Sequence, residues 1–518
     1  MKHNIFTPLL ILTLLMSLGT GCIRDNSTLE DPSQFASIDI TGIEESLTAT
    51  PRSQLKLAPT VTSTYPDSDL EYFWMAYPKL DEGEKQVATD TLGTSKDLDY
   101  RVILKPGTYK LVFKVVSKSD GFTAHKESTI SVSELQTMGF LILTEPTPGV
   151  TEVDLFDVNT QKLVPHLITD YFGKPLEGSP LFLDVNYDMA HLDPEDYKAE
   201  TMTKVNSTVF SITTSAGKAL SLRSSDFAYV FPDQKVFNSD PTPEPAIGRL
   251  FGAAYSYIVT DQGLHYSFKR SALWTATRGL FSDPITEPVS PHIFGMIDEY
   301  LAYNFCAWSY TRGILCLFSS NRAEPLNGQP AAVTKYEPLY GGTSLVGKGP
   351  GVSFLILQEK EKPDNRRIVY IDLDKVKSIE EVDKSSHLNS ADLFAVSGRS
   401  AQILYYVSGG SLYAYALNGT QAERQLTLTG LPAGSKITYI DNIFWLNDKD
   451  KSHRFDHLVV GTQSGDSYKL YFYNTVGGIP DGAPVRTIEG KGTLARVAYI
   501  ALEDPSVRNA APSFPILY

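Results

Sequence analysis

Along most of the chain, apolar and polar residues alternate with a period of two, which is the pattern of β-strands whose two faces meet different surroundings. The clearest run covers residues 107–116, where Tyr109, Leu111, Phe113 and Val115 share one face. Tyr (28) and Phe (25) are abundant and Met (7) is scarce, while 37 Gly and 31 Pro supply turns. The pattern predicts an all-β protein made of many short strands.

The N-terminal segment differs, because residues 5–18 are almost wholly apolar and follow the single charge of Lys2. This run is too short to span a bilayer but has the length of a signal-peptide core. Small residues then precede Cys22, an arrangement that resembles the lipobox of bacterial lipoproteins, although that family prefers Leu where this chain has Gly19. The resemblance implies that residues 1–21 are a lipoprotein signal peptide and that Cys22 carries a diacylglycerol. The alternative is an ordinary signal peptide followed by an incidental cysteine.

Residues 22–35 are polar and lack an apolar period, so we interpret them as a flexible tether between a membrane and the folded body.

Residues 36–135 contain short strands with a central Trp74, and the sequence Gly107-Thr-Tyr109 opens a late strand. About 100 residues of this kind predict an immunoglobulin-like β-sandwich with Trp74 in its core. These residues resemble the PKD-like modules of Bacteroidota lipoproteins. The Trp-Asp-Phe-Gly-Asp-Gly signature of standard PKD domains is absent, which places the resemblance with the divergent branch.

Residues 139–518 show one hairpin after another, with turns centred near residues 148, 216, 262, 311, 363, 409 and 465. The spacing of about fifty residues matches one blade of a β-propeller and predicts seven blades. We interpret residues 186–200, in the longest interval, as an insertion on one rim. Two stacked sandwich domains are the competing interpretation, because hairpins alone do not establish closure.

The hairpin around Thr311 carries Cys306 and Cys316. If the turn centres on Thr311, the two cysteines face each other, and an oxidising compartment would permit a disulfide. The alternative is a pair of buried thiols.

Signatures of hydrolases, zinc enzymes and dithiol enzymes are absent from the sequence. Residues 342–348 have phosphate-loop spacing, but Gly349 replaces the hydroxyl residue that would hold Mg²⁺. The acidic and histidine-rich segment 447–457 is typical of a solvated loop rather than a metal site. We therefore predict no catalytic residue, metal or cofactor. Trp274 and Tyr340 are the candidate ligand-binding aromatics. Trp274, Trp308 and Trp445 could each stack on a sugar if they face a rim, but the usual place for each is a blade core.

The formal net charge of −14 opposes binding to nucleic acid. The order of lipobox, tether, PKD-like module and β-repeat resembles the PKD-like family lipoproteins, which accompany starch-utilisation-type outer-membrane importers. This resemblance implies a non-enzymatic accessory, lipid-anchored in the outer membrane at the cell surface, that captures glycan or peptide for such an importer. The alternatives are a propeller hydrolase or lyase with carboxylates at the central mouth, and a structural or adhesive surface protein.

Overall fold

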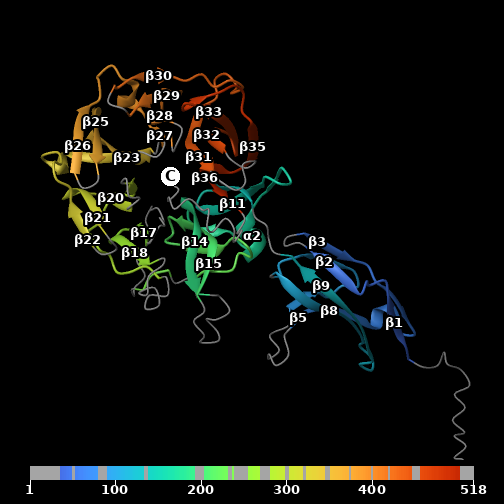
Figure 1. Ribbon diagram of the computed structural model, residues 1–518. Helices are drawn as coiled ribbons and strands as arrows, with labels where there is room; N and C mark the ends of the chain where they lie inside the picture. The colour runs from blue at the N-terminus through green and yellow to red at the C-terminus, as the bar shows by residue number, and fades with distance from the viewer. Residues whose placement is uncertain are drawn as a thin grey trace, which may run out of the picture. The chain divides into compact units, whose positions relative to one another are not determined.

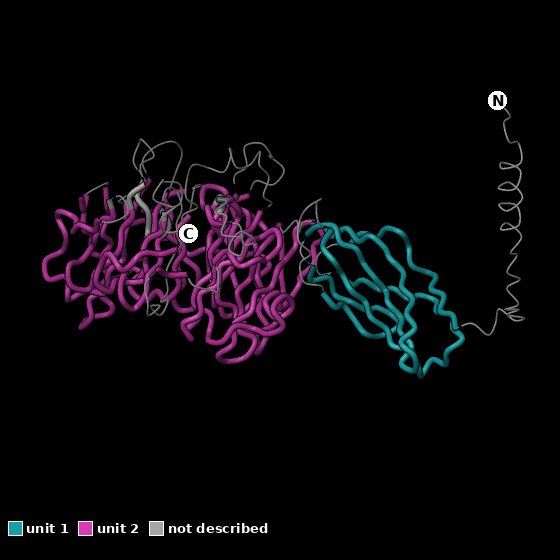
Figure 2. The backbone as a smooth tube through the Cα atoms, turned by 90° about the horizontal axis from the view of Figure 1, so that it is seen from below, with its two compact units in different colours: residues 1–133 teal, residues 134–518 magenta. Residues whose placement is uncertain are grey.

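A computed structural model describes residues 36–49, 53–79, 90–104, 106–133, 138–192, 204–231, 236–238, 255–268, 280–297, 303–318, 322–344, 351–372, 375–397, 401–417, 420–445 and 455–501. The chain divides into two compact units, residues 1–133 and residues 134–518, which Figure 2 shows in different colours. Cys22 and Trp274 lie outside the described residues.

Unit 1 contains one large sheet and two short strand pairs. The large sheet runs in the order β2 (Ser46–Ala49), β9 (Thr123–Val132), β8 (Gly107–Ser117), β5 (Leu70–Pro78) and β6 (Asp90–Gly93). Only its β2–β9 pairing is parallel. The short pairs are β1 (Ile38–Thr41) with β4 (Thr60–Ser63), and β3 (Gln54–Leu57) with β7 (Leu98–Arg101); a 3₁₀ turn, η2 (Asp67–Asp69), precedes β5.

The core of unit 1 lies on one face of the large sheet, where residues of the two short pairs cover it. Trp74 is fully buried there, its ring stacks on Phe113 at 4.3 Å between centroids, and its indole nitrogen donates to the Ser95 carbonyl. The predicted face of β8 is also buried, from Tyr109 to Val115. The sandwich predicted around Trp74 is therefore confirmed.

Unit 2 has seven sheets among its described strands, and Figure 1 shows them following one another around an axis. In spatial order, the first sheet contains β36 (Thr493–Ile500), β10 (Gly139–Glu145), β11 (Val150–Asp157) and β12 (Lys162–Val164), with β13 (Leu176–Glu177) also on β11; the second contains β14 (Pro180–Leu192), β15 (Lys204–Thr214) and β16 (Ala219–Arg223); and the third contains β17 (Tyr255–Thr260) and β18 (Gly263–Phe268). The fourth sheet contains β19 (Phe294–Ile297), β20 (Tyr303–Ser309), β21 (Gly313–Phe318) and β22 (Arg322–Pro325), and the fifth contains β23 (Tyr336–Ser344), β24 (Val352–Glu359), β25 (Lys362–Asp372) and β26 (Lys375–Glu381). The sixth sheet contains β27 (Leu393–Val396), β28 (Ile403–Ser408), β29 (Ser411–Ala416) and β30 (Glu423–Gln425), and the seventh contains β31 (Ile437–Trp445), β32 (Phe455–Ser464) and β33 (Ser467–Val476), with β34 (Ile479–Pro480) and β35 (Arg486–Lys491) both on β33. The described helices of unit 2 are short: α2 (Leu167–Phe172), η4 (Val333–Lys335) and η5 (His387–Ser390).

The first sheet of unit 2 joins the beginning of the repeat to its end. Strand β36 pairs with β10 in antiparallel register, with Gly139 opposite Ile500 and Phe140 opposite Tyr499. The last strand of the repeat thus completes the sheet that the first strands begin, which is how a propeller joins its ends. The fold class is confirmed as all-β with a propeller-like repeat, while the count of seven blades stays a prediction.

Each sheet of unit 2 packs between its neighbours, as β10 illustrates. Phe140 and Ile142 point into the cluster shared with β32, β33 and β35, whereas Leu141 and Leu143 point into the cluster shared with β14, β15 and β16. A strand covered on both faces needs apolar residues on both, which explains why β10 is an unbroken apolar run rather than an alternating one.

Six of the seven expected turns fall where they were predicted, and one does not. The strand β25 already begins at Lys362, because Glu359 pairs with Lys362 and the reversal occurs at residues 360–361. The polar residues 363–365 form an irregularity in the strand rather than the turn. Residues 186–192 also differ from expectation, since they belong to β14 and pair with β15 instead of forming an insertion.

Candidate functional site

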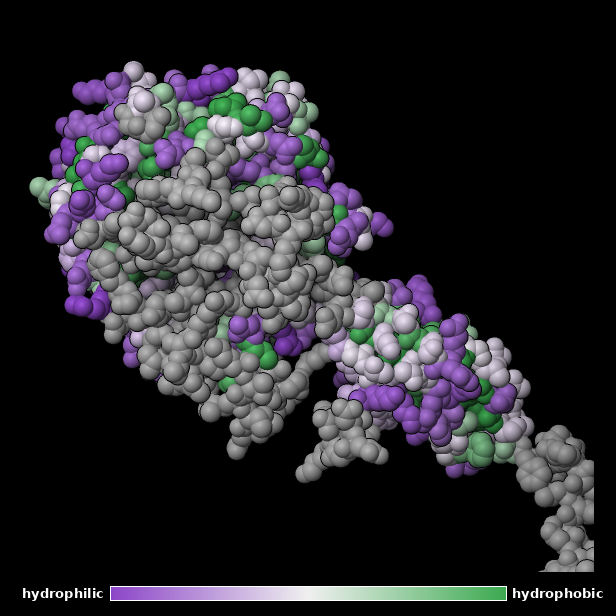
Figure 3. All heavy atoms as spheres, in the orientation of Figure 1, coloured by the Kyte–Doolittle hydropathy of each residue, from purple (hydrophilic) through white to green (hydrophobic). Residues whose placement is uncertain are grey.

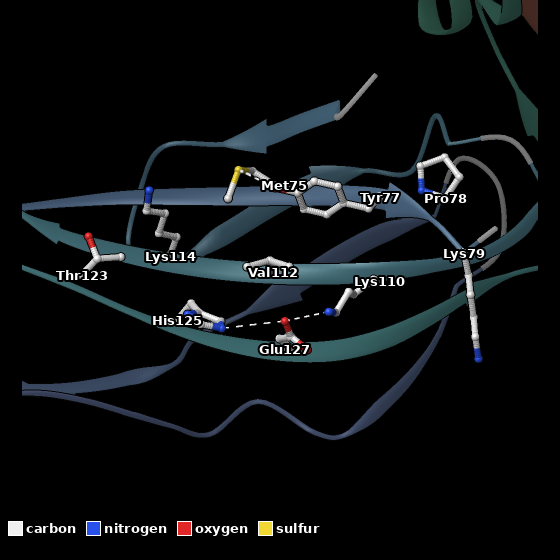
Figure 4. A pocket seen from close by; sticks show the side chains of 10 residues that line it. All are labelled: Met75, Tyr77, Pro78, Lys79, Lys110, Val112, Lys114, Thr123, His125 and Glu127. Atoms are coloured by element: carbon white, nitrogen blue, oxygen red, sulfur yellow. Dashed lines mark hydrogen bonds and ion pairs between the residues drawn. The ribbon is translucent and has the colours of Figure 1, made fainter. Parts of the chain in front are cut away.

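A groove of about 700 Å³ lies on unit 1. It lies on the face of the large sheet opposite the Trp74 core, across β5, β8 and β9 (Figure 4). The period of two explains this position: while Trp74 and Phe113 point into the core, their neighbours in sequence point outward. The groove is therefore built on rigid strands rather than on loops.

The register of the strands places the groove residues in rows across the sheet. Met75 pairs with Val112, which in turn pairs with Glu127. One row further along, Lys114 pairs with His125. These five side chains come from three strands that are not all neighbours in sequence, and only the pairing brings them to one surface.

The floor of the groove is apolar and half-buried. Met75 and Val112 lie at its centre, and the Tyr77 hydroxyl donates to the Met75 sulfur at 3.6 Å. This contact lays the tyrosine ring along the sheet, as Figure 4 shows. A flat aromatic ring beside aliphatic side chains offers a platform for the apolar face of a ligand.

The rim of the groove is positively charged. Of the residues that the structure describes, Lys79, Lys110 and Lys114 line it together with one acidic residue, Glu127. The Lys110 ammonium lies 2.8 Å from a Glu127 carboxylate oxygen, and His125 Nε2 lies 3.8 Å from the same oxygen. Among the described residues, Lys79 and Lys114 have no ion-pair partner, so both lysines add uncompensated positive charge to the rim.

A smaller cavity of about 170 Å³ lies in unit 2 beside α2. Phe172 and Tyr229 stack in its wall at 4.9 Å between ring centroids. Lys174, Lys218 and Glu177 also line it, so its charge is mixed. Its size fits a few waters or a small group rather than a polymer.

Two buried carboxylates in unit 2 resemble functional acids but are fully engaged in holding the fold. Glu152 accepts bonds from the backbone of Ile168 and Thr169 at the start of α2, and burial raises its pKa. Asp154 accepts from the His166 backbone and from the Tyr468 hydroxyl at 2.8 Å, and burial likewise raises its pKa. Each carboxylate satisfies donors that would otherwise be buried without partners.

A third carboxylate, Glu423, gathers several donors at the edge of its sheet. It accepts bonds from Ser386, from His387 Nδ1 at 2.6 Å, and from the Tyr406 hydroxyl. The imidazole of His387 stacks on Tyr413 at 4.4 Å. Because Ser386 donates to the carboxylate rather than to the histidine, the cluster lacks the relay that activates a serine nucleophile.

No group of three or more His, Cys, Asp and Glu side chains that could hold a metal ion occurs within the described ranges. No described helix is long and apolar enough to cross a membrane.

The candidate residues from the sequence occupy different places. Tyr340 is half-buried in β23, where its ring stacks at 5.7 Å on Phe394 of β27, so it packs between its own sheet and the next one. Trp308 and Trp445 are buried, as expected of blade cores. Cys306 and Cys316 lie directly opposite each other across the β20–β21 hairpin, and both are buried thiols that are not joined by a disulfide in the structure.

The groove on unit 1 was not identified from the sequence, although part of its signal is visible there. Lys110, Val112 and Lys114 alternate with the core residues of the same run and must point outward. The sequence around these three residues, however, does not show that they share a surface with Met75 and His125. Figure 3 shows hydrophilic and hydrophobic residues mixed over the described surface of unit 1 on the face that it draws.

Comparisons with known proteins agree with this architecture. Residues 30–180 match the model of the PKD-like family, which confirms the resemblance inferred from Trp74 and the Gly-x-Tyr strand. The fold is similar to that of a quinonprotein alcohol dehydrogenase-like protein from Bacteroides thetaiotaomicron, with 14% identity, a TM-score of 0.50, and coverage of 90% of this chain and 99% of that chain. A weaker match, to the SREBP–SCAP binding domains of fission yeast, has 9% identity, a TM-score of 0.32, and coverage of 58% and 76%, and it carries no argument. No curated protein matches the sequence.

Proposed function

We propose that this protein, whose residues 30–180 belong to the PKD-like family, is a lipid-anchored binding protein at the cell surface that captures glycan or peptide for a starch-utilisation-type outer-membrane importer. The observation that carries the proposal is the groove on unit 1, a preformed hollow with an apolar floor and a polar rim. Ligand sites commonly combine these two features, because burial of an apolar floor stabilises the complex and polar groups at the rim orient the ligand.

Binding is tested with the soluble fragment 23–518 on arrays of glycans and peptides. The matched variant is Val112→Glu, which places a carboxylate in the middle of the groove floor while leaving the core face of β8 unchanged. We expect the native fragment to bind at least one class of ligand and the variant to lose that binding while melting at the same temperature. Absence of any glycan or peptide binding by the native fragment contradicts the proposal.

The membrane anchor is tested separately by metabolic labelling with a palmitate analogue. Native chain is expected to incorporate the label, and Cys22→Ala to remain unlabelled. Equal labelling of the two would remove the lipid anchor from the proposal while leaving the binding function intact.

The importer is tested by crosslinking on whole cells grown on the glycan or peptide that binds. We expect an outer-membrane importer among the crosslinked partners of the native chain, and a lower uptake rate of that nutrient in a strain lacking the protein. Unchanged uptake at limiting nutrient would contradict this part of the proposal.

A further inference from the structure

We propose that the groove on unit 1 binds a polysaccharide that carries carboxylate groups, a uronate polymer. This inference rests on the proposed function and deepens it by naming the ligand class. It starts from the charge of the groove, which is opposite in sign to that of the protein as a whole.

The lining of the groove differs in charge from the chain as a whole. The full chain has a formal net charge of −14, yet the described residues that line the groove include three lysines and one glutamate. Glu127 is already engaged by Lys110, which leaves the ammonium groups of Lys79 and Lys114 without an ion-pair partner among the described residues. Lysines that line one hollow attract carboxylates, while the net negative charge of the chain opposes densely charged polymers such as nucleic acids.

The shape of the groove favours an extended polymer over an enclosed small molecule. Lys110 and Lys114 are four residues apart on β8, a separation of about 13 Å at ~3.3 Å per residue. Lys79 lies beyond the end of β5 on the same face (Figure 4). A ligand that reaches all three must bear negative charges at intervals over several sugar rings.

The floor of the groove supplies an apolar surface on which a sugar ring can pack. The Tyr77 ring lies along the sheet beside Met75, and Val112 adds aliphatic surface at the centre. The carbon-bound hydrogens of a sugar ring pack on an aromatic face of this kind, whereas its carboxylate reaches the rim. An acidic peptide would instead draw on main-chain pairing with a strand edge, which this central face does not offer.

The experiment measures binding of the fragment 23–518 to polygalacturonate by calorimetry, with its methyl ester as the matched ligand. The two polymers share a backbone and differ in charge. We expect binding to polygalacturonate that weakens as salt is raised, and little binding to the ester. Equal affinity for both polymers, or equally tight binding of polyglutamate or single-stranded DNA, overturns the inference.

Substitutions then locate the site with effects of opposite sign. Lys79→Gln and Lys114→Gln are each expected to weaken binding roughly two- to fivefold, the range for one exposed ion pair. Glu127→Gln removes the one acidic side chain among the described residues that line the groove and is expected to tighten binding by a similar factor. Lys56→Gln, which removes an exposed lysine of β3 paired with Asp99, is the control and leaves the affinity unchanged.

The outcomes separate the inference from the proposed function. Binding of the methyl ester or another neutral glycan that the lysine substitutions do not alter would overturn the uronate assignment and leave glycan capture standing. A loss caused by Lys56→Gln as large as that caused by Lys114→Gln would overturn the location in the groove.

Discussion

The hydrogen bond between Tyr468 and Asp154 is expected to stabilise the junction between the two ends of the repeat in unit 2. Tyr468 lies on β33 and is fully buried, and its hydroxyl donates to Asp154 of β11 across 314 positions of sequence. Tyr468→Phe removes the hydroxyl and leaves a buried carboxylate with one donor fewer. Because hydrogen bonds to charged groups contribute about 1.5–3 kcal/mol, we expect a loss of about 2 kcal/mol in the free energy of unfolding of unit 2.

The size of this effect should depend on pH. Burial raises the pKa of Asp154, so the folded chain holds the proton more tightly than the unfolded chain, in which the group titrates near its ordinary pKa of about 3.9. The stability that this proton adds is therefore fully present below that ordinary pKa and is lost as the pH rises through the raised one. Since the Tyr468 hydroxyl favours the ionised carboxylate, the penalty of Tyr468→Phe should be largest at alkaline pH and should shrink toward pH ~4.

The same strand offers a matched control. Tyr473 is also fully buried on β33, but its hydroxyl has no hydrogen-bond partner among the residues that the structure describes. Tyr473→Phe removes the same atom without breaking a bond, so it is expected to be neutral or slightly stabilising. Thermal unfolding followed by circular dichroism should show Tyr468→Phe melting about 2–3 °C below the native chain at pH 8. Equal melting temperatures for the two variants, or a Tyr468→Phe penalty that grows in acid, would refute the reasoning.

Three further predictions concern other parts of the chain. Arg312 binds Glu287 through two hydrogen bonds and lowers its pKa to about 2. Glu287→Gln should therefore cost about 1 kcal/mol at pH 7, an estimate discounted for partial exposure of the pair. That cost should vanish in melting curves as the pH falls from about 4.3 toward 2, and a constant cost would contradict it. Trp74→Ala should cost about 3–5 kcal/mol and make unit 1 sensitive to limited proteolysis, whereas Trp74→Phe should retain most of the protection. Burial raises the pKa of the Cys306 thiol, so neither Cys306 nor Cys316 should react with a maleimide in the native reduced chain, while both should react after unfolding, as mass spectrometry would show.

Much of the architecture could be predicted because its signals are local. The alternation in β8 separates Tyr109 and Leu111 from Lys110 and Val112 wherever the strand is placed, since successive side chains of a strand point to opposite faces. The hairpin around Thr311 similarly places Cys306 opposite Cys316, because a short turn determines the register of both strands. The turn near residue 363 was misplaced because its polar residues belong to an irregular part of a strand. Polarity alone does not distinguish a turn from an irregular strand.

The sequence by itself thus determined the strands, their faces and the repeat, whereas the tertiary structure alone decided which distant strands meet. Whether Lys114 shares a surface with Met75 depends on the pairing of β5 with β8, and the bond from Tyr468 to Asp154 depends on β36 joining β10. These pairings are selected by the packing of whole sheets. Packing depends on all the apolar faces at once, while the pattern along one strand depends only on its own residues.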